Sequence, residues 1–312
     1  MKIRLHGVRG SLPTPIPSSE FTSKMEVILN SAIADYKKNP KGFEVKKFLK
    51  QHQAENLLLG GNTTCVSVLT DSNELIIFDM GTGIRILGNE LAAKAFSEGI
   101  TVHIFLTHTH WDHIQGWPFF KPAYSPQTTV NFYSLIPNLQ ERLERQQHPE
   151  NFPISLDMMA SKKNFHVLKE NESLKVGSVA ITPFFLTHPG TCTGYKIQNG
   201  VRNFLFCTDV EIEEDNPHFL EKVKPILEKT NLLIIDAQYS EEEAEKKKGW
   251  GHTSMNRAVH FAESIHAEEV VLTHHEPDHS DAKIQSIFQD EALPEQDKIK
   301  VTLAQEGMEF LL

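Results

Sequence analysis

Short apolar runs recur along the chain and alternate with stretches of helical period. Several of these runs end in Asp, Thr or His. Apolar strands with polar residues at their ends are typical of a buried sheet that carries a site along one rim. The pattern therefore predicts an α/β fold. Strands are expected at residues 1–7, 67–69, 75–78, 102–106, 179–181, 203–206, 232–235 and 270–272.

Residues 18–53 differ in character and are predicted to form a helical insertion near the N-terminus. The positions that follow the i, i+3, i+4, i+7 spacing of an amphipathic helix are Met25, Ile28, Leu29, Ala32, Ile33 and Tyr36. Ser18 or Ser19 is expected to cap this helix. The apolar residues of a shorter second helix are Val45, Phe48 and Leu49. Because the insertion lies between glycine-bearing loops at 7–11 and 60–64, we consider three roles for it: packing, a lid or a dimer surface.

The rest of the chain contains no sign of a second domain. Its 312 residues, of which 39% are hydrophobic, are enough to bury a large core. No Pro/Gly/Ser-rich linker or low-complexity tract divides them. We therefore expect a single domain over residues 1–312 with the insertion inside it. The N-terminus lacks an apolar signal core and no stretch approaches roughly 18 apolar residues, so no membrane span is expected.

Cysteine usage and net charge restrict the cellular compartments and the classes of partner that we expect. Cys65, Cys192 and Cys207 are an odd number without metal-type spacing, so reduced, buried thiols in a cytoplasmic protein are expected. The net charge is −10, from 31 basic and 41 acidic residues. That balance disfavours a protein that holds long nucleic acid by neutralising phosphates. A small anionic substrate stays compatible with it, because bound metal cations can dominate the local field.

The candidate chemistry is concentrated in the segment Thr107-His108-Thr109-His110-Trp111-Asp112-His113, directly after the expected strand 102–106. A lone histidine here would most often be a surface residue. Three imidazoles and a carboxylate within six residues are not explained by packing. Neutral imidazole nitrogen is a good ligand for zinc and similar ions, and a carboxylate compensates their charge. The segment therefore predicts a metal site.

This H-x-H-x-D-H pattern resembles the signature of the metallo-β-lactamase superfamily. Further matching positions follow in the family's order over roughly residues 60–280: Asp79, His188, Asp209 and His274. Asp79 ends an expected strand and is followed by a glycine-bearing turn, as is the family's early aspartate. The fold that the resemblance implies is a four-layer αββα sandwich.

The resemblance also implies a set of ligands for two divalent metal ions, with zinc expected first and manganese or iron as alternatives. One metal would be bound by His108, His110 and His188, and the other by Asp112, His113 and His274. Asp209 would bridge them, while Asp79 would support the histidine loop without binding metal. His275 stays open as an alternative last ligand. His274 is preferred because the expected strand 270–272 leads into it.

Other branches of the superfamily differ at single positions. Flavin-linked di-iron members resemble H-x-E-x-D, whereas this chain has His110 at the third position, which disfavours redox chemistry. True β-lactamases often have cysteine where this chain has Asp209. An aspartate there resembles the thioesterase and phosphodiesterase branches.

A second cluster resembles the ribonuclease Z branch. His252 lies in Gly249-Trp250-Gly251-His252-Thr253-Ser254, before an expected helix with Ala258, Phe261, Ala262 and Ile265. The resemblance implies that His252 protonates the leaving oxygen and that Asp236, where the branch usually has Glu, orients it. A hydroxide bridging the two metals would attack phosphorus, and Asp112 could accept the proton of that nucleophile as well as bind metal. Protonation of a poor leaving group by an imidazolium contributes on the order of 10²–10⁴-fold.

Two departures from ribonuclease Z bear on the substrate. No Gly/Pro-rich arm of the kind that grips transfer RNA is found in the sequence. The segment 111–120 instead resembles a bacterial phosphodiesterase-like subgroup that includes cyclic-nucleotide hydrolases. Its aromatic residues, which serve either core packing or an apolar wall for a base, are Trp111, Trp117, Phe119 and Phe120.

The sequence thus favours a binuclear metal-dependent hydrolase that cleaves a phosphodiester bond in a cyclic nucleotide, a small nucleotide or a short nucleic-acid end. The alternatives are a thioesterase- or lactamase-type hydrolase of the same fold and a ribonuclease Z-like tRNA endonuclease. A non-catalytic module is disfavoured by the intact set of ligand positions. The expected partner is a small phosphodiester, with long nucleic acid and a membrane disfavoured and a homodimer considered.

Overall fold

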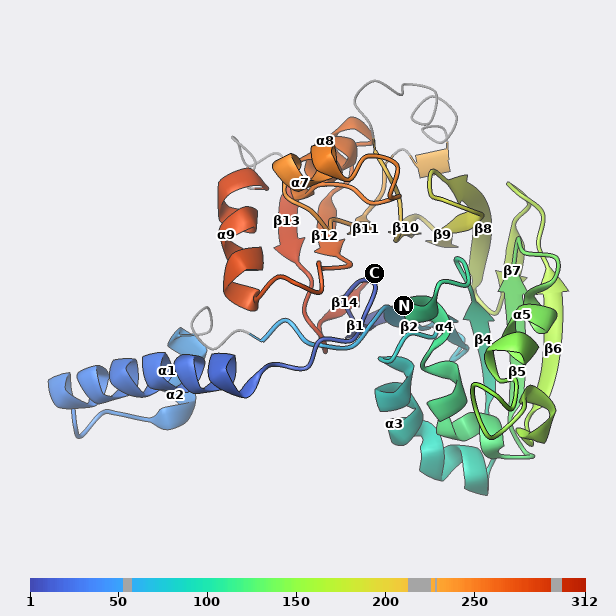
Figure 1. Ribbon diagram of the computed structural model, residues 1–312, viewed down its shortest axis with the longest axis horizontal. Helices are drawn as coiled ribbons and strands as arrows, with labels where there is room; N and C mark the ends of the chain where they lie inside the picture. The colour runs from blue at the N-terminus through green and yellow to red at the C-terminus, as the bar shows by residue number, and fades with distance from the viewer. Residues whose placement is uncertain (53–57, 213–225, 228, 293–298) are drawn as a thin grey trace.

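Two mixed sheets of seven strands each organise the molecule (Figure 1). The computed structural model describes residues 1–52, 58–212, 226–227, 229–292 and 299–312. The strand order is β14-β1-β2-β3-β4-β5-β6 in the first sheet and β13-β12-β11-β10-β9-β8-β7 in the second. Because β1 and β14 pair side by side, the two ends of the chain meet in one sheet.

The first sheet changes from antiparallel to parallel pairing at β3. Its strands are β1 (Lys2–Gly7), β2 (Cys65–Leu69), β3 (Leu75–Phe78), β4 (Thr101–Phe105), β5 (Thr129–Ser134), β6 (Lys162–Val167) and β14 (Glu309–Leu311). The pairs from β14 to β3 are antiparallel, and those from β3 to β6 are parallel. The register places Leu75 opposite Val102 and Phe78 opposite Phe105.

The second sheet has the same change of direction at β10. Its strands are β7 (Leu174–Val176), β8 (Val179–Leu186), β9 (Cys192–Asn199), β10 (Arg202–Cys207), β11 (Leu232–Asp236), β12 (Glu269–Thr273) and β13 (Lys300–Leu303). Pairing is antiparallel from β7 to β10 and parallel from β10 to β13. The parallel strands are close to uniformly buried, which explains their continuous apolar runs.

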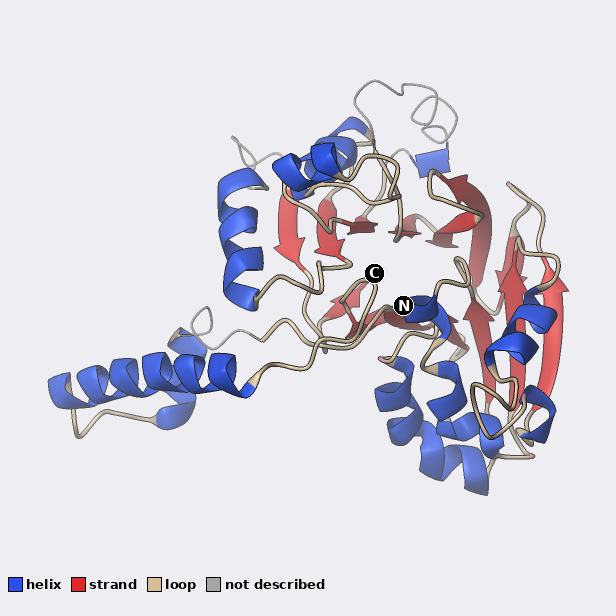
Figure 2. Ribbon diagram, in the orientation of Figure 1, coloured by secondary structure: helices blue, strands red, loops and turns tan. Residues whose placement is uncertain are grey.

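Helices cover the outer faces of the two sheets (Figure 2). The first sheet is covered by α3 (Ile84–Ser97), α4 (Trp111–Ile114), α5 (Leu139–Gln146) and the 3₁₀ turns η1 (Trp117–Phe119), η2 (Lys121–Tyr124) and η3 (Leu156–Met158). The second sheet is covered by α7 (Glu241–Lys246), α8 (Met255–Ser264) and α9 (Asp281–Glu291).

Three apolar clusters hold the described layers together. One lies between the sheets and includes Phe78 and Phe206. A second joins Ile104 to α3, and a third joins Leu205 to α8. Leu205 and Phe206 are neighbours in the chain but face different layers, because side chains alternate across a strand. The expected α/β fold with four αββα layers is confirmed.

A helical arm projects from this sandwich at the position of the expected insertion (Figure 1). It consists of α1 (Ser18–Lys38) and α2 (Val45–Gln51). No residue of α1 is buried, and in α2 only Phe48 is. A salt bridge of 3.0 Å from Lys24 to Asp281 joins α1 to the body.

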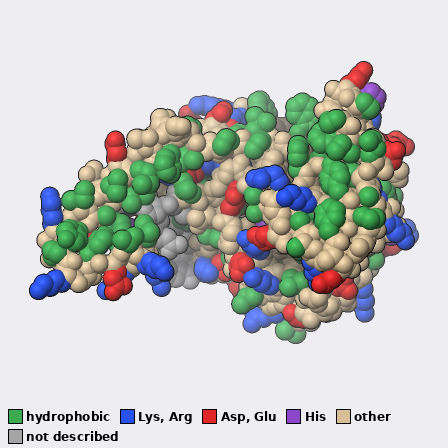
Figure 3. Space-filling model, turned by 90° about the horizontal axis from the view of Figure 1, so that it is seen from below, with side chains coloured by type: hydrophobic (Ala, Val, Ile, Leu, Met, Phe, Trp, Pro, Cys, Tyr) green, Lys and Arg blue, Asp and Glu red, His purple; other side chains and the backbone are tan. Residues whose placement is uncertain are grey.

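The arm exposes the apolar stripe that the sequence pattern would place against a core. Figure 3 shows apolar side chains gathered along it. The exposed ones on α1 are Phe21, Met25, Val27, Leu29, Ile33 and Tyr36. Packing against the body is therefore not the role of this stripe, while a lid or a dimer surface stays a prediction.

The expected cap of the first helix was wrong. Pro17, with extended backbone, precedes the helix and no side chain caps it. Ser18 and Ser19 already lie inside the first turn. Residue 53, the last of the expected insertion, is outside the described residues. No described helix is long and apolar enough to cross a membrane.

Candidate metal centre and active site

The site residues follow the carboxyl ends of parallel strands in both sheets. Asp79 follows β3, Asp209 follows β10 and His274 follows β12. Each of these three has a positive φ, of 60°, 56° and 64° respectively, so the chain turns sharply as it leaves each strand. Because such strand ends meet at one edge of a sheet, residues far apart in sequence converge there.

The histidine segment leaves β4 and is held in place by Asp79. The backbone N–H of Thr107 donates to Asp79 Oδ1 at 2.8 Å, and His113 Nδ1 lies 2.8 Å from Asp79 Oδ2. A carboxylate can only accept, so in its neutral, metal-binding form His113 has its proton on Nδ1 and the lone pair of Nε2 free. α4 then begins at Trp111, which puts Asp112 and His113 on its single turn.

A first group of donors comprises His108, His110, His188 and Asp209. One donor atom from each lies within 4.8 Å of all the others. His110 Nδ1 is 3.2 Å from His188 Nε2, and His108 Nε2 is 3.6 Å from Asp209 Oδ2. His188 Nδ1 donates to the carbonyl of Gly251 at 2.8 Å, which leaves its Nε2 as the donor toward the group.

A second group comprises Asp112, His113, Asp209 and His274, all buried and again within 4.8 Å of one another. Asp209 Oδ1 is 3.0 Å from His113 Nε2 and 3.2 Å from His274 Nε2. The Oδ2 atom of the same carboxylate faces the first group. Asp209 is therefore shared by both groups, one oxygen to each.

The donor set fits divalent metal ions. The Nε2 atoms of His108 and His113 are buried and have no hydrogen-bond partner among the described atoms. The lone pair of a buried imidazole that no donor satisfies is costly unless a cation binds it. Imidazoles and carboxylates together are the usual ligands of zinc and of neighbouring transition metals.

The electrostatics of the site also favour cations. Burial alone would lower the pKa of His113, but the surrounding carboxylates, Asp112 first, raise it well above its ordinary value. Burial likewise opposes charge on His274, yet Asp209 and its neighbours raise its pKa to about 9. A field that stabilises an imidazolium at these positions would also stabilise a bound metal ion.

The structure brings His274, and not His275, into the site. His274 Nε2 lies 3.1 Å from Asp112. The neighbouring His275 faces the other way and contacts the carbonyl of Ala304 through Nε2 at 2.9 Å. Burial lowers the pKa of His275 to about 3, so its ring is neutral and packed into the body.

His252 and Asp236 lie beside the second group. His252 Nδ1 is 2.7 Å from Asp236 Oδ2, and Asp236 Oδ1 accepts from the backbone N–H of Thr253 at 3.1 Å. The His252 ring stacks on His274, with 4.9 Å between ring centres. Since Asp236 engages Nδ1, the Nε2 atom is the one left for a substrate.

An open cavity of about 370 Å³ connects these groups. Its lining residues are Ser11, Thr109, His110, Trp111, Asp112, Asp209, His252 and His274. The donor groups, the His252 imidazole and an exposed tryptophan thus face one space large enough for the reacting part of a small substrate.

Several supporting residues were missed from the sequence. The N–H of Ser11 donates to Asp112 Oδ2 at 2.9 Å, and Gln238 Oε1 contacts His274 Nδ1 at 3.0 Å. A side chain at Gly10 would come within 2.5 Å of the His274 ring. The glycine-bearing loop at 7–11 was visible in the sequence, but nothing there indicated that it contacts the metal site.

The loop that carries His252 is held by Glu211. Its two carboxylate oxygens accept from the N–H groups of Gly249, at 2.6 Å, and Gly251, at 2.9 Å. Gly251 has φ of +88°, and a Cβ there would meet His188 Nδ1 at 2.1 Å. This position therefore requires glycine both for its backbone and for its closeness to His188.

The aromatic segment after the motif is divided between core and site. Trp117 and Phe120 are buried in the cluster beneath the first sheet. Phe119 contacts Phe152 with ring centres 5.5 Å apart. Of these four aromatic residues, only Trp111 lines the cavity, and it is 78% exposed. The apolar wall considered from the sequence thus reduces to Trp111.

The chain is similar to known proteins over more than half of its length. Residues 76–275 match the family described as "Beta-lactamase superfamily domain". A ribonuclease BN of Cronobacter sakazakii is 26% identical over 145 residues, which cover 44% of this chain and 44% of that protein. The chain thus spans less than half the length of this relative.

Two further proteins match over more of their length. A ribonuclease Z of Oenococcus oeni is 24% identical over 270 residues, covering 68% of this chain and 80% of the relative. The crystal structure of the short form of human tRNase Z superposes with a TM-score of 0.62 at 17% identity, covering 100% of this chain and 99% of that one. The latter similarity shows a shared fold.

Proposed function

Since this chain belongs to the metallo-β-lactamase superfamily, we propose that it is a metal-dependent hydrolase of phosphodiester bonds, acting on a small nucleotide, a cyclic nucleotide or a short nucleic-acid end. The observation that carries this proposal is the His252–Asp236 pair, 2.7 Å apart, beside the shared carboxylate of Asp209. The ribonuclease Z and ribonuclease BN relatives support it.

The proposed ligands are those brought together in the two donor groups. One divalent cation would be held by His108, His110 and His188 and the other by Asp112, His113 and His274, with Asp209 between them. Zinc is the first expectation. Two such cations would supply a low-pKa water and stabilise the charge that develops on a phosphoryl group.

The side chains would then orient the reaction and move protons. Asp112, fixed by the N–H of Ser11, is placed to accept the proton of the attacking water on a carboxylate oxygen. His252 would donate a proton from Nε2 to the leaving oxygen. Asp236 holds the opposite side of that ring through its contact with Nδ1 and so orients Nε2 toward the leaving group.

The hydrolysis of thioesters or lactams is the competing chemistry within the fold. A thioester leaves as a thiolate, which does not require a proton from a positioned acid to the same extent as an alkoxide does, whereas the nitrogen of a lactam does require one. The pair of His252 and Asp236 is unneeded in thioester hydrolysis, and the entirely buried carboxylate of Asp236 is costly to maintain. A ribonuclease acting on RNA is the second candidate, because the named relatives favour it.

Metal content is the first testable consequence. Protein purified without chelator, or reconstituted after chelation, is expected to hold about two equivalents of Zn, Mn or Fe per chain. Elemental analysis measures this directly. A His275→Gln variant serves as a control, because His275 faces away from the site. Less than one equivalent in a folded protein would contradict the two-metal proposal.

A substrate screen with defined metal content tests the reaction itself. Bis-p-nitrophenyl phosphate is expected to be hydrolysed, and cyclic nucleotides, short oligonucleotides and tRNA precursors then rank the natural substrates. A thioester and a lactam should be turned over far more slowly. If the thioester or the lactam is hydrolysed and no phosphodiester is, the proposed reaction is wrong. The fold and the two donor groups would be unaffected by that result.

A further inference from the structure

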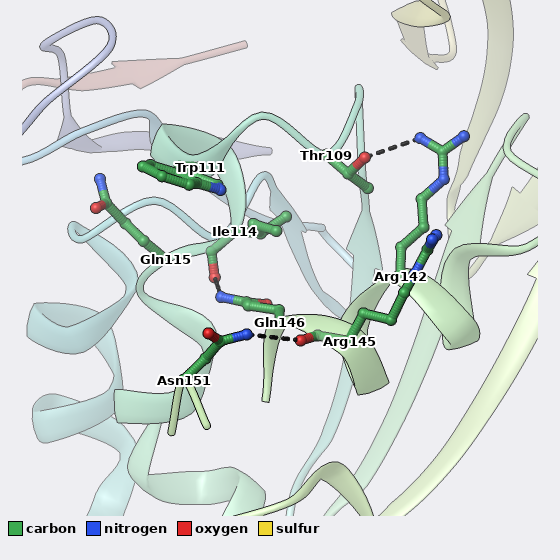
Figure 4. A pocket seen from close by; sticks show the side chains of 8 residues that line it. All are labelled: Thr109, Trp111, Ile114, Gln115, Arg142, Arg145, Gln146 and Asn151. Atoms are coloured by element: carbon green, nitrogen blue, oxygen red, sulfur yellow. Dashed lines mark hydrogen bonds between the residues drawn. The ribbon is translucent and has the colours of Figure 1, made fainter. Parts of the chain in front are cut away.

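A pocket of about 600 Å³ lies next to the active-site cavity (Figure 4). Its lining residues are Thr109, Trp111, Ile114, Gln115, Arg142, Arg145, Gln146 and Asn151. Thr109 and Trp111 also line the cavity at the donor groups. The two spaces therefore adjoin at these two residues, and a molecule bound at the donor groups lies beside the larger one.

Two guanidinium groups border this pocket on α5. Arg142 donates to Thr109 Oγ1 at 2.9 Å and to Asn138 Oδ1 at 3.1 Å, both neutral acceptors. Within the described residues neither Arg142 nor Arg145 has an ion pair, although the whole chain has a net charge of −10. Uncompensated arginines beside a pocket are typical of phosphate recognition.

Arg142 lies close to the segment that carries the donor histidines, so its positive charge is near the proposed reaction site. Thr109, its hydrogen-bond partner, lies between His108 and His110 in the chain. A substrate whose scissile phosphate is held at the donor groups would therefore place its neighbouring anionic group at Arg142. Figure 4 shows Arg142 and Arg145 on one side of the pocket, with Trp111 across from them.

Trp111 and Gln146 suit a planar, polar-edged group. Trp111 is 78% exposed, which is unusual for so large a side chain unless a ligand or partner covers it. Gln146 lines the same pocket, where it is fixed by donating to the carbonyl of Ile114 at 2.8 Å. A nucleobase offers a face for the indole and polar edge groups for such a lining.

We propose that this pocket binds the part of a short oligonucleotide next to the scissile bond, with a base against Trp111 and the adjacent phosphate at Arg142 and Arg145. The inference rests on the proposed phosphodiesterase function and selects among its substrates. A 3′,5′-cyclic mononucleotide has one phosphate, and that phosphate belongs at the donor groups. Such a substrate leaves both guanidinium groups without an anion.

The test compares a uridine dinucleotide with and without a 5′-terminal phosphate. Binding to metal-loaded protein is measured by calorimetry on dinucleotides whose internal linkage is a non-hydrolysable methylene phosphonate, so it does not depend on cleavage. The wild type is expected to bind the phosphorylated dinucleotide about tenfold more tightly, because one charge-assisted contact is gained. Arg142→Gln and Arg145→Gln should each reduce this preference toward unity. Trp111→Ala should weaken both ligands alike, by about fivefold to a hundredfold.

Arg202→Gln is the matched control. Arg202 begins β10, whose opposite end leads to Asp209, so it lies roughly 20 Å from the site. Its replacement removes the same charge and should leave the preference intact. Arg145 is an exposed helix residue, so its variant separates lost anion binding from a disturbed histidine segment, which Arg142 contacts.

Equal binding of the two dinucleotides to the wild type, no binding of either, or a preference that survives both arginine variants would overturn the proposal. The failure of the proposed function gives a different result. In that case the expected binding preference is found, but neither the dinucleotide with its natural phosphodiester linkage nor bis-p-nitrophenyl phosphate is hydrolysed.

Discussion

Replacing Asp209 with alanine is expected to reduce turnover on the order of 10³-fold or more. This carboxylate belongs to both donor groups, with Oδ1 toward His113 and His274 and Oδ2 toward the first group. Burial opposes its ionisation, but the neighbouring imidazoles, His113 first, hold its pKa well below the usual range. Its removal therefore takes away the one fixed negative charge common to both metal positions.

The variant is expected to remain folded, because the apolar clusters do not depend on this side chain. Elemental analysis should find that at least one metal equivalent is lost. Asp209→Asn is the better-matched change, since asparagine tolerates the left-handed backbone at φ 56° while alanine is strained there. If Asp209→Asn keeps both metals and near-normal turnover, Asp209 does not bridge them.

The replacement of His252 with alanine is expected to cost most where the leaving group is poorest. A sugar alkoxide needs a proton as it departs, so the rate on a nucleotide linkage should fall on the order of 10²–10⁴-fold. p-Nitrophenolate leaves without help, so the rate on its esters should change little. Metal content should be unchanged, because His252 is not among the proposed ligands. Steady-state kinetics on the two substrate types measure the contrast.

Two companion variants sharpen this result. Asp236→Asn should give a smaller loss with the same dependence on leaving group, because it weakens only the hydrogen bond that orients the imidazole. His260→Ala, at an exposed position on α8, controls for the loss of a histidine elsewhere. An equal loss on both substrate types after His252→Ala would indicate a role in binding or structure.

The fold was most predictable where strands are buried on both faces. β3 was expected at 75–78 and is found there, and β10, β11 and β12 were located to within a residue at each end. Their apolar runs are continuous because both faces are covered. Six strands were missed, because they are short or mix polar and apolar residues, and four of them lie at the edges of their sheets. They are β5, β6, β7, β9, β13 and β14.

The site was predictable only where its residues are adjacent or resemble a family pattern. The histidine segment concentrates three imidazoles within six residues, so it is visible alone. His188, Asp209 and His274 had to be recognised by resemblance, because their closeness arises from strand order and not from spacing. Contacts made by a backbone N–H, such as that of Ser11, or by residues of a distant helix, such as Arg142, leave no comparable pattern.

The sharp turns at Asp79, Asp209 and His274 position the site residues but lower the free energy of unfolding of the chain. A non-glycine residue in left-handed conformation costs about 1–2 kcal/mol, and three of them occur at strand ends that the chain would otherwise leave without strain. Glycine, which has no Cβ, would relieve that cost at these positions. Selection for thermal stability alone would therefore replace these three residues early. In a lineage that no longer needs its substrate, substitutions at these positions would increase stability and remove activity. The three strand-end positions are therefore where loss of function would first be seen in the sequence.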